Sequence, residues 1–421
     1  MAPAGFFVDI TPLRRFKEFR RLWFGLVFAQ VGGQLGIVAA SYQVYRLTHS
    51  SLDVGYVSLA QLFPAIIGSI LGGSIADSMD RRKLLIITES SMALCTAGLA
   101  INAHSAHASL MLIFVLSAIT AGIGGCDSSA RTAMLMATID REFFVQANTL
   151  RQLIVQVAII VGPAIGGLLL APIGVSGVFW LNAGAFVLTA TAVATLRPSI
   201  PDGGGTRFGL SSVVEGFSFL RGRQALQACF VADLNAMIFG MPTSLFPALG
   251  LAYFHGGPEA VGFLFAAPGV GALIATVASG WTSRIRHPGR AVVLSIAIWG
   301  VAITLFGLIP LLWVALIFLA IAGAADVVSA VFRGTIVQLE APDELRGRIS
   351  AIQLGVVQSG PRLGNLEAGG VAQAISNQFS VVSGGIASII GIAIIARSMP
   401  RLLSYEIARV NEEHHISETN D

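Results

Sequence analysis

Apolar residues run along this chain in twelve long stretches, each separated from the next by a few polar, glycine or proline residues. A helix of about 20 apolar residues is long enough to cross the hydrocarbon core of a bilayer. The pattern therefore predicts an all-α membrane protein with twelve transmembrane helices. We expect these helices at about 21–46, 54–76, 83–103, 108–138, 146–170, 174–196, 224–254, 258–282, 289–309, 311–339, 348–374 and 378–397.

One polar break is much longer than the others, and it divides the twelve stretches into two sets of six. It spans 197–223 and contains two prolines and a run of three glycines near its start. Such a composition is typical of a linker. We expect a cytoplasmic N-terminal segment (1–20), a six-helix bundle (21–196), a cytoplasmic linker (197–223), a second six-helix bundle (224–397) and a cytoplasmic tail (398–421).

An internal repeat supports the same division. Arg131, in the fourth stretch, is echoed by Arg333 in the tenth, and Gly162-Pro163 in the fifth is echoed by Gly360-Pro361 in the eleventh. Parallel repeats of six helices are typical of transporters in which one bundle moves against the other.

Composition and charge then narrow the class. Of 421 residues, 54% are hydrophobic and 12% are charged, whereas soluble domains carry about 25% charged residues. Lys and Arg gather in alternate loops, which places both termini in the cytoplasm. The lipid bilayer is the expected partner; nucleic acid is not, because the basic residues lie between apolar stretches.

Two motifs resemble the major facilitator superfamily. The loop between the second and third helices resembles its signature loop, with Asp80 where the family more often has glycine. A Gly-Pro motif in the fifth helix resembles that of its antiporters. Short identities at 246–249, 261–267, 287–289, 305–310 and 347–349 resemble the enterobactin exporter branch. The motif residues are Gly73, Asp77, Arg81 and Arg82 in the loop, and Gly162, Pro163, Gly166 and Gly167 in the fifth helix.

The resemblance implies a gate between the bundles. Asp77 would meet the start of the eleventh helix when the transporter faces outward, and Arg81 would pair with an acid after the fourth helix, Asp140 or Glu142. The fifth-helix motif would allow close packing and a bend, because its glycines lack side chains and its proline lacks a backbone donor. In the alternative interpretation, the basic residues of the loop are topology signals alone.

Ionisable residues inside apolar stretches are the main site candidates, because they are costly in lipid unless they face a cavity or a partner. Asp127 and Arg131 lie four residues apart, so they share a helix face and can form an ion pair. Asp326 and Arg333 lie seven apart, also on one face. We hypothesise proton antiport with Asp127, Asp233 and Asp326 as carriers; the alternative is static pairs or positions near the membrane surface, and for Glu89 we favour that alternative.

The remaining polar residues suggest a substrate cavity for a small molecule. An anionic, aromatic siderophore of the enterobactin type fits arginines and phenylalanines, and an amphipathic drug fits them equally. The sequence thus predicts a proton-coupled siderophore exporter, with multidrug efflux as the alternative. The cavity candidates are Gln30, Gln34, Arg131, Arg333, Phe239, Arg362 and Glu367.

Other classes of function find little support. A receptor or scaffold would need an interaction domain, and no polar segment is long enough for one. An enzyme would need a catalytic cluster, and neither a phosphate-binding GxxxxGK[ST] loop nor a dinucleotide motif in a suitable context is present. Three isolated cysteines in apolar stretches indicate small buried side chains. We therefore expect no enzyme activity, no cofactor and no metal, and a monomer.

Overall fold

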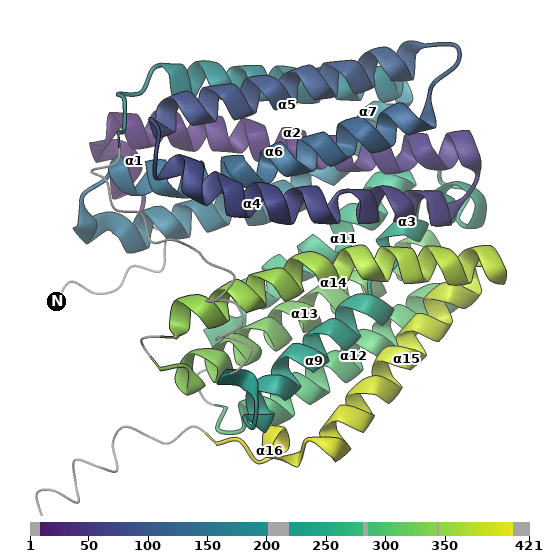
Figure 1. Ribbon diagram of the computed structural model, residues 1–421. Coiled ribbons are helices and arrows are strands. Elements are labelled where there is room, and N and C mark those ends of the chain that lie inside the picture. The colour runs from purple at the N-terminus through teal and green to yellow at the C-terminus, as the bar shows by residue number, and fades with distance from the viewer. Residues whose placement is uncertain (1–8, 201–218, 281–284, 343–344, 407–421) are drawn as a thin grey trace, which may run out of the picture.

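The computed structural model describes residues 9–200, 219–280, 285–342 and 345–406, and within them the chain forms helices and short connections (Figure 1). The middle of the predicted linker (201–218) and the tail beyond 406 lie outside the described residues.

The first half of the chain forms one bundle, drawn from purple to teal in Figure 1. A short N-terminal helix and a 3₁₀ turn flank its long helices. Their bounds are α1 (Thr11–Arg15), α2 (Lys17–Thr48), α3 (Ser51–Ala60), α4 (Leu62–Ala76), α5 (Arg81–His104), α6 (Leu110–Ala137), η1 (Arg141–Phe143) and α7 (Phe144–Ala194).

The second half forms the other bundle, drawn from teal to yellow. Its first span consists of a long helix, α9, and three short helical pieces that follow it after a break. A small terminal helix follows its last span. The bounds are α9 (Gln224–Phe239), η2 (Thr243–Leu245), α10 (Phe246–Ala248), η3 (Leu249–Tyr253), α11 (Gly257–Val277), α12 (Pro288–Leu308), α13 (Leu312–Glu340), α14 (Arg346–Ala374), α15 (Asn377–Ser398) and α16 (Pro400–Leu403).

The prediction of twelve spans in two bundles is confirmed. Ten helical stretches of the described residues are long and apolar enough to cross a membrane. The longest, Arg141–Ala194, holds two spans joined at Gly174, whose positive φ of 67° is readily adopted by glycine. The remaining span, the eleventh in chain order, is α14, which is less apolar because it carries Gln, Arg, Asn and Glu side chains.

Local sequence explains where several helices begin. The side chains of Ser50, Asp80, Ser109 and Ser376 each accept a hydrogen bond from a backbone N–H in the first turn of the helix that follows. Such caps satisfy donors that have no partner within the helix. The turns between spans are therefore short and defined.

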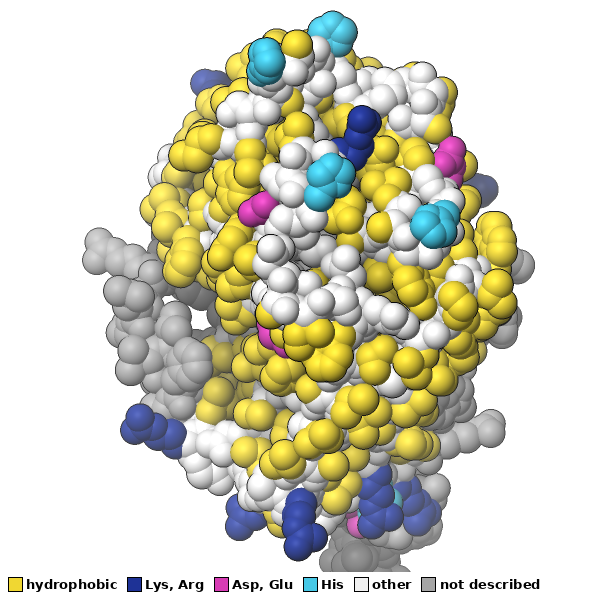
Figure 2. Space-filling model, turned by 90° about the vertical axis from the view of Figure 1, so that its right-hand side faces the viewer, with side chains coloured by type: hydrophobic (Ala, Val, Ile, Leu, Met, Phe, Trp, Pro, Cys, Tyr) yellow, Lys and Arg dark blue, Asp and Glu magenta, His cyan; other side chains and the backbone are white. Residues whose placement is uncertain are grey.

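The outer surface is that of a membrane protein. Large apolar side chains stand exposed on helices of both bundles, including Leu94 at 74%, Trp313 at 69% and Phe63 at 68% exposure. Figure 2 shows hydrophobic side chains over most of the visible surface, with Lys and Arg gathered along its lower edge. Exposed apolar area of this extent is stable only against lipid or another apolar partner.

The two bundles meet at one end and separate toward the other, where α1 and α16 lie (Figure 1). The meeting end is built on α7 against α11 and on α3 against α14. Ser51 at the start of α3 donates to Asn377 Oδ1 on α15 at 2.7 Å. Glycines allow the close approach: a Cβ on Gly167 would lie 2.5 Å from the Cα of Gly262 and 2.9 Å from the carbonyl oxygen of Pro258.

We predict that Gly167→Ala weakens this contact, because its methyl group would overlap the α11 backbone at a cost of about 1–3 kcal/mol. Cysteines at positions 51 and 377, in a background lacking Cys95, Cys126 and Cys229, report closure of this end by disulfide formation. We expect a several-fold lower cross-linking rate in Gly167→Ala.

Gly184→Ala is the matched control, because it lies on the same helix and an added Cβ there has no neighbour within 4 Å. Equal cross-linking in both alanine variants would show that the Gly167–Gly262 contact does not govern closure.

Candidate functional site

In the first bundle, α5 and α6 bring two carboxylates to one arginine. Arg131 donates from Nε and Nη2 to Asp127 Oδ2, one turn earlier on α6, at 3.0 and 2.7 Å. The same Nη2 contacts Glu89 Oε1 on α5. Thr88 donates its hydroxyl to Asp127 Oδ1 at 2.8 Å. Glu89 is fully buried, and Asp127 and Arg131 are nearly so. We call Glu89, Asp127 and Arg131 the first acid–arginine cluster.

In the second bundle, α9 and α13 repeat this composition with different partners. Arg333 Nη2 lies 2.7 Å from Asp233 Oδ1 on α9 and 3.9 Å from Asp326 Oδ1 on its own helix. Its Nη1 donates to the hydroxyl of Ser329 at 3.0 Å. Asp233 and Arg333 are buried, whereas the Asp326 side chain is 34% exposed. Asp233, Asp326 and Arg333 form the second acid–arginine cluster.

The two clusters have the same charge balance, two carboxyl groups for one guanidinium. An uncompensated charge away from water costs several kcal/mol. When both acids are ionised, each cluster has two negative charges and one positive charge, and its net charge is therefore negative. One bound proton makes the cluster neutral. The charge balance of each cluster is the feature on which a proton-coupling hypothesis can be built.

The clusters follow the internal repeat only in part. The offset of 202 residues between Arg131 and Arg333 also relates Asp127 to Ser329, so the acid one turn before the arginine is replaced by a hydroxyl in the second half. Asp233 on α9 supplies the short ion pair instead. The helix that provides the second partner thus differs between the bundles: the third span in one, the seventh in the other.

The spacing-based predictions agree with this geometry. Asp127 pairs with Arg131, and Asp326 reaches Arg333 from the same helix face. The pairing of Asp233 with Arg333 could not be read from the sequence, because the two helices are far apart in the chain. Glu89, for which a static pair or a position near the membrane surface was the favoured interpretation, is fully buried and pairs with Arg131.

The predicted gating residues lie where the bundles separate. Gly73 is in the last turn of α4, and Asp77, which follows that helix, is exposed. Arg82 donates to the carbonyl oxygen of Ala194 at the end of α7. Asp80 caps α5 and also accepts from the backbone N–H of Ser199 at 3.0 Å. The loop is thereby tied to the chain that leaves the first bundle.

The predicted latch partner of Arg81 is not engaged in this conformation. Glu142 lies 3.5 Å from Arg15 instead, and no ion pair joins Arg81 to Asp140 in the part of the chain that the structure describes. Arg81 donates from Nε to the carbonyl oxygen of Ala76 at 3.4 Å. The latch implied by the resemblance belongs to the state in which this end is closed, and it stays a prediction.

The fifth-helix motif faces two ways. Gly162 and Gly166 pack against α2, where a Cβ on Gly162 would meet the side chain of Gln34 and one on Gly166 would touch Leu35. Gly167 faces α11 of the other bundle, as does the carbonyl oxygen of Pro163. The motif therefore joins packing inside the first bundle to the contact between bundles.

The seventh span, predicted as one continuous helix, contains a break. Its first part, α9, stops at Phe239, and a short irregular segment precedes η2. Trp299 donates from Nε1 to the freed carbonyl oxygen of Gly240 at 2.7 Å. Asn365 on α14 accepts from the Ser244 N–H at 2.9 Å. Interrupted helices occur at membrane depth where neighbouring groups satisfy the backbone in this way.

Asn365 also reaches the other bundle. Its Oδ1 accepts from the Thr243 hydroxyl at 2.6 Å, and its Nδ2 donates to Ser58 Oγ on α3 at 3.2 Å. Asn365 is not among the predicted site residues, although a buried amide in an apolar run is the type of signal that marks a functional position. One side chain thus connects the broken seventh span, α14 and the first bundle.

The other cavity candidates are dispersed. Gln30 and Gln34 lie one turn apart on α2, and Phe239 ends α9, where its carbonyl oxygen faces Gly384. Arg362 and Glu367 lie on either side of Asn365 on α14, and both are half-buried. Among the described residues, no hydrogen bond or ion pair joins these side chains to one another, and no group of His, Cys, Asp or Glu is placed to hold a metal ion.

Comparison with known proteins gives consistent results. The family model described as transmembrane secretion effector matches residues 8–419. The enterobactin exporter EntS of Shigella boydii serotype 18 is 28% identical over 396 residues, covering 92% of this chain and 93% of that protein.

Two solved structures share the fold. A POT family transporter in complex with 5-aminolevulinic acid superposes with a TM-score of 0.74 at 12% identity, over 92% of this chain and 97% of that chain. A bacterial homologue of the human lysosomal transporter Spinster, inward-facing and unoccupied, superposes with a TM-score of 0.72 at 16% identity, over 93% and 98%.

We predict that Arg131→Gln strongly destabilises the protein, by about 3–5 kcal/mol, because it leaves two buried carboxylates without their counter-ion. Thermal unfolding of the purified protein in detergent measures the change. Adding Glu89→Gln to the same chain removes one of the two charges and should restore part of the loss.

Arg151→Gln is the control, because this arginine bonds to Asn148 on the exposed side of its own helix. Equal unfolding temperatures for Arg131→Gln and Arg151→Gln would contradict the structural importance of the cluster.

Proposed function

This chain belongs to the transmembrane secretion effector family within the major facilitator superfamily, and from that premise we propose that it exports a small molecule from the cytoplasm in exchange for protons. Members of the superfamily are transporters, so the chain is a multi-pass membrane transporter and not an enzyme. The direction, the coupling ion and the substrate are the proposed part.

The observation that carries the coupling proposal is the charge balance of the two clusters. Each bundle buries two carboxyl groups around one arginine, so a single proton neutralises each cluster. The proposed carriers are Asp127, Asp233 and Asp326. The arginines hold their partners on two different helices of one bundle, so a movement between those helices would alter proton affinity.

The arrangement of the bundles supports alternating access. They meet at the end away from α1 and α16 and separate at the end where those helices lie (Figure 1). If the basic loops lie in the cytoplasm, as the positive-inside rule predicts, this conformation faces inward. The proposed cycle then closes the Asp77 loop against the second bundle and parts the contact between Gly167 and Gly262.

We propose a siderophore of the enterobactin type as the substrate. The support is the similarity of nearly the whole chain to an enterobactin exporter. A molecule of this type is anionic and aromatic. The side chains that would suit it are the half-buried Gln30, Gln34, Phe239, Arg362 and Glu367 and the buried Arg131 and Arg333. Multidrug efflux is the alternative, because the same side chains suit an amphipathic drug.

The proposed setting follows from the same relatives. The similarity to bacterial proteins of similar length supports a bacterial plasma (inner) membrane as its location. We propose both termini in the cytoplasm, with 197–223 as the cytoplasmic linker, and a monomer as the working unit.

The substrate is tested in cells that lack the protein. We expect siderophore to accumulate inside and to return to the medium with the wild-type gene but not with Asp77→Asn. Normal secretion together with new sensitivity to a panel of drugs would overturn the siderophore proposal in favour of multidrug efflux.

Proton coupling is tested in proteoliposomes with an acidic lumen. The wild type should accumulate iron-free siderophore against its gradient. We predict that Asp233→Asn lowers this accumulation by about tenfold or more while exchange of internal for external siderophore persists, because the amide keeps the shape but binds no proton.

Asp9→Asn is the matched control, because Asp9 is exposed and lies before α1. Undiminished proton-driven accumulation in Asp127→Asn, Asp233→Asn and Asp326→Asn alike would show that the clusters do not carry the proton.

A further inference from the structure

A groove on the outer surface of the second bundle lies between α12 and α13, outside the acid–arginine clusters. It encloses about 610 Å³, which falls within the range of about 300–1,000 Å³ typical of small-molecule sites. On α13 its wall is formed at Ile321, Ala324, Ala325 and Val328, one face of the helix. Asp326, Ser329 and Arg333 lie on another face, so the groove is separate from the second cluster.

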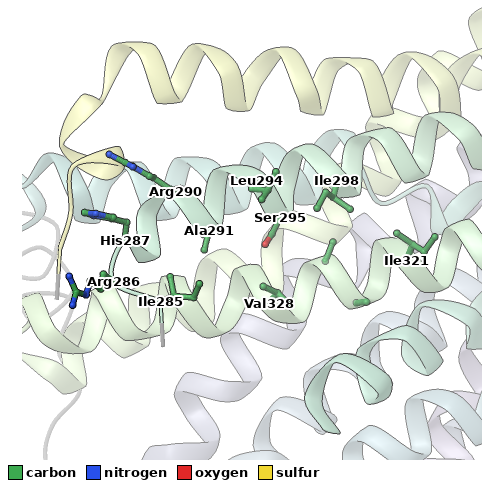
Figure 3. A pocket seen from close by; sticks show the side chains of 12 residues that line it. Ile285, Arg286, His287, Arg290, Ala291, Leu294, Ser295, Ile298, Ile321 and Val328 are labelled. Atoms are coloured by element: carbon green, nitrogen blue, oxygen red, sulfur yellow. The ribbon is translucent and has the colours of Figure 1, made fainter. Parts of the chain in front are cut away.

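The walls of the groove are apolar and face the membrane. Leu294 is 62% exposed, Ile298 43% and Ile321 40%, and small residues such as Ala291 and Ala324 leave the space between the helices open. The Ser295 hydroxyl is the polar exception within the walls (Figure 3). Such a surface, on a face that contacts lipid, favours a hydrocarbon chain as its occupant.

One end of the groove is basic. Arg286, His287 and Arg290 lie together there, at the start of α12 and at the end of the molecule where the bundles separate (Figure 3). Arg290 is held by a hydrogen bond from its Nε to the carbonyl oxygen of Leu403 on α16, at 3.2 Å. The Nδ1 atom of His287 is buried and has no hydrogen-bond partner in the described part of the chain.

These charges are placed against the preference of the helix. The N-terminus of a helix carries a partial positive charge, so acidic residues stabilise its first turn and basic residues do not. The first turn of α12 has no acidic residue and no side-chain cap. The positive-inside rule accounts for basic residues in this loop, but it does not account for their position at the mouth of an apolar groove.

We infer that this groove binds an anionic phospholipid, with its phosphate between Arg286, His287 and the start of α12 and one acyl chain along the α12–α13 walls. The basic end matches the headgroup and the apolar walls match the chain, as in other basic pockets between transmembrane helices. The bound lipid would join α12 to α13 and, through Arg290, to α16.

The test is native mass spectrometry of the full-length protein in detergent, titrated with phosphatidylglycerol or with phosphatidylcholine of the same acyl chains. We expect one phosphatidylglycerol to be retained with at least about fivefold higher affinity than phosphatidylcholine. The double variant Arg286→Gln with Arg290→Gln should lose about tenfold in affinity for phosphatidylglycerol.

The control has the same loss of charge on the same bundle: Arg397→Gln with Arg401→Gln, both exposed at the end of α15 and the start of α16. Its affinity should change by less than about twofold. Equal losses in the two double variants would mean a general attraction of anionic lipid to basic loops and would overturn the proposal.

A third variant tests the groove without touching its charges. Ala291→Phe places a ring between α12 and α13 and should weaken phosphatidylglycerol binding as much as the loss of the two arginines. If that variant does not fold, as judged by its unfolding temperature, Ala324→Phe fills the groove from the facing helix. Wild-type affinity in a folded groove-filling variant, or displacement of the lipid by millimolar inorganic phosphate, would show a headgroup site alone and overturn the acyl-chain part.

Discussion

The cost of burying charge in a low-dielectric interior is the constraint on which this structure depends. Arg131 and Arg333 are almost completely buried, each about two turns before the C-terminal end of a long helix. Neither position is tolerable unless acids surround the guanidinium. Each arginine pairs with a carboxylate on a second helix as well as with one on its own helix. These pairs connect α5 to α6 in one bundle and α9 to α13 in the other. The groups that fix these helices against each other are the same ones that we propose as proton carriers.

The backbone obeys the same constraint where the seventh span is broken. Carbonyl and amide groups freed at Gly240 and Ser244 find partners in Trp299 and Asn365, so the break is stable although it is buried. Because Asn365 also reaches Ser58, the break is connected to the contact between the bundles. A change at that contact therefore alters the hydrogen bonds that hold the seventh span. This is the type of connection that a moving gate requires.

The contact between the bundles is narrow and built on small residues. Gly167 and Gly262 bring two helix backbones together where any side chain would separate them, and hydrogen bonds such as Ser51 to Asn377 complete the contact. Buried apolar side chains of both bundles pack together at the same end of the molecule. The core of the second bundle is one apolar cluster that lies wholly in the second half of the chain. A second cluster joins residues of the first bundle, such as Leu35 and Leu170, to Ala248 and Val261 of the second.

The sequence by itself determined the number of spans, the division into two halves and the superfamily, because apolar length, loop charge and local motifs are properties of contiguous residues. It also determined the pairs within one helix, Asp127 with Arg131 and Asp326 with Arg333, because helical periodicity places residues four or seven apart on one face. Only the tertiary structure decided that Glu89 and Asp233 complete the clusters, that the seventh span is broken, and that Asn365 links the bundles. Those contacts join helices that are distant in the chain. The faces that meet depend on how all twelve helices pack, and a local sequence pattern does not contain that information.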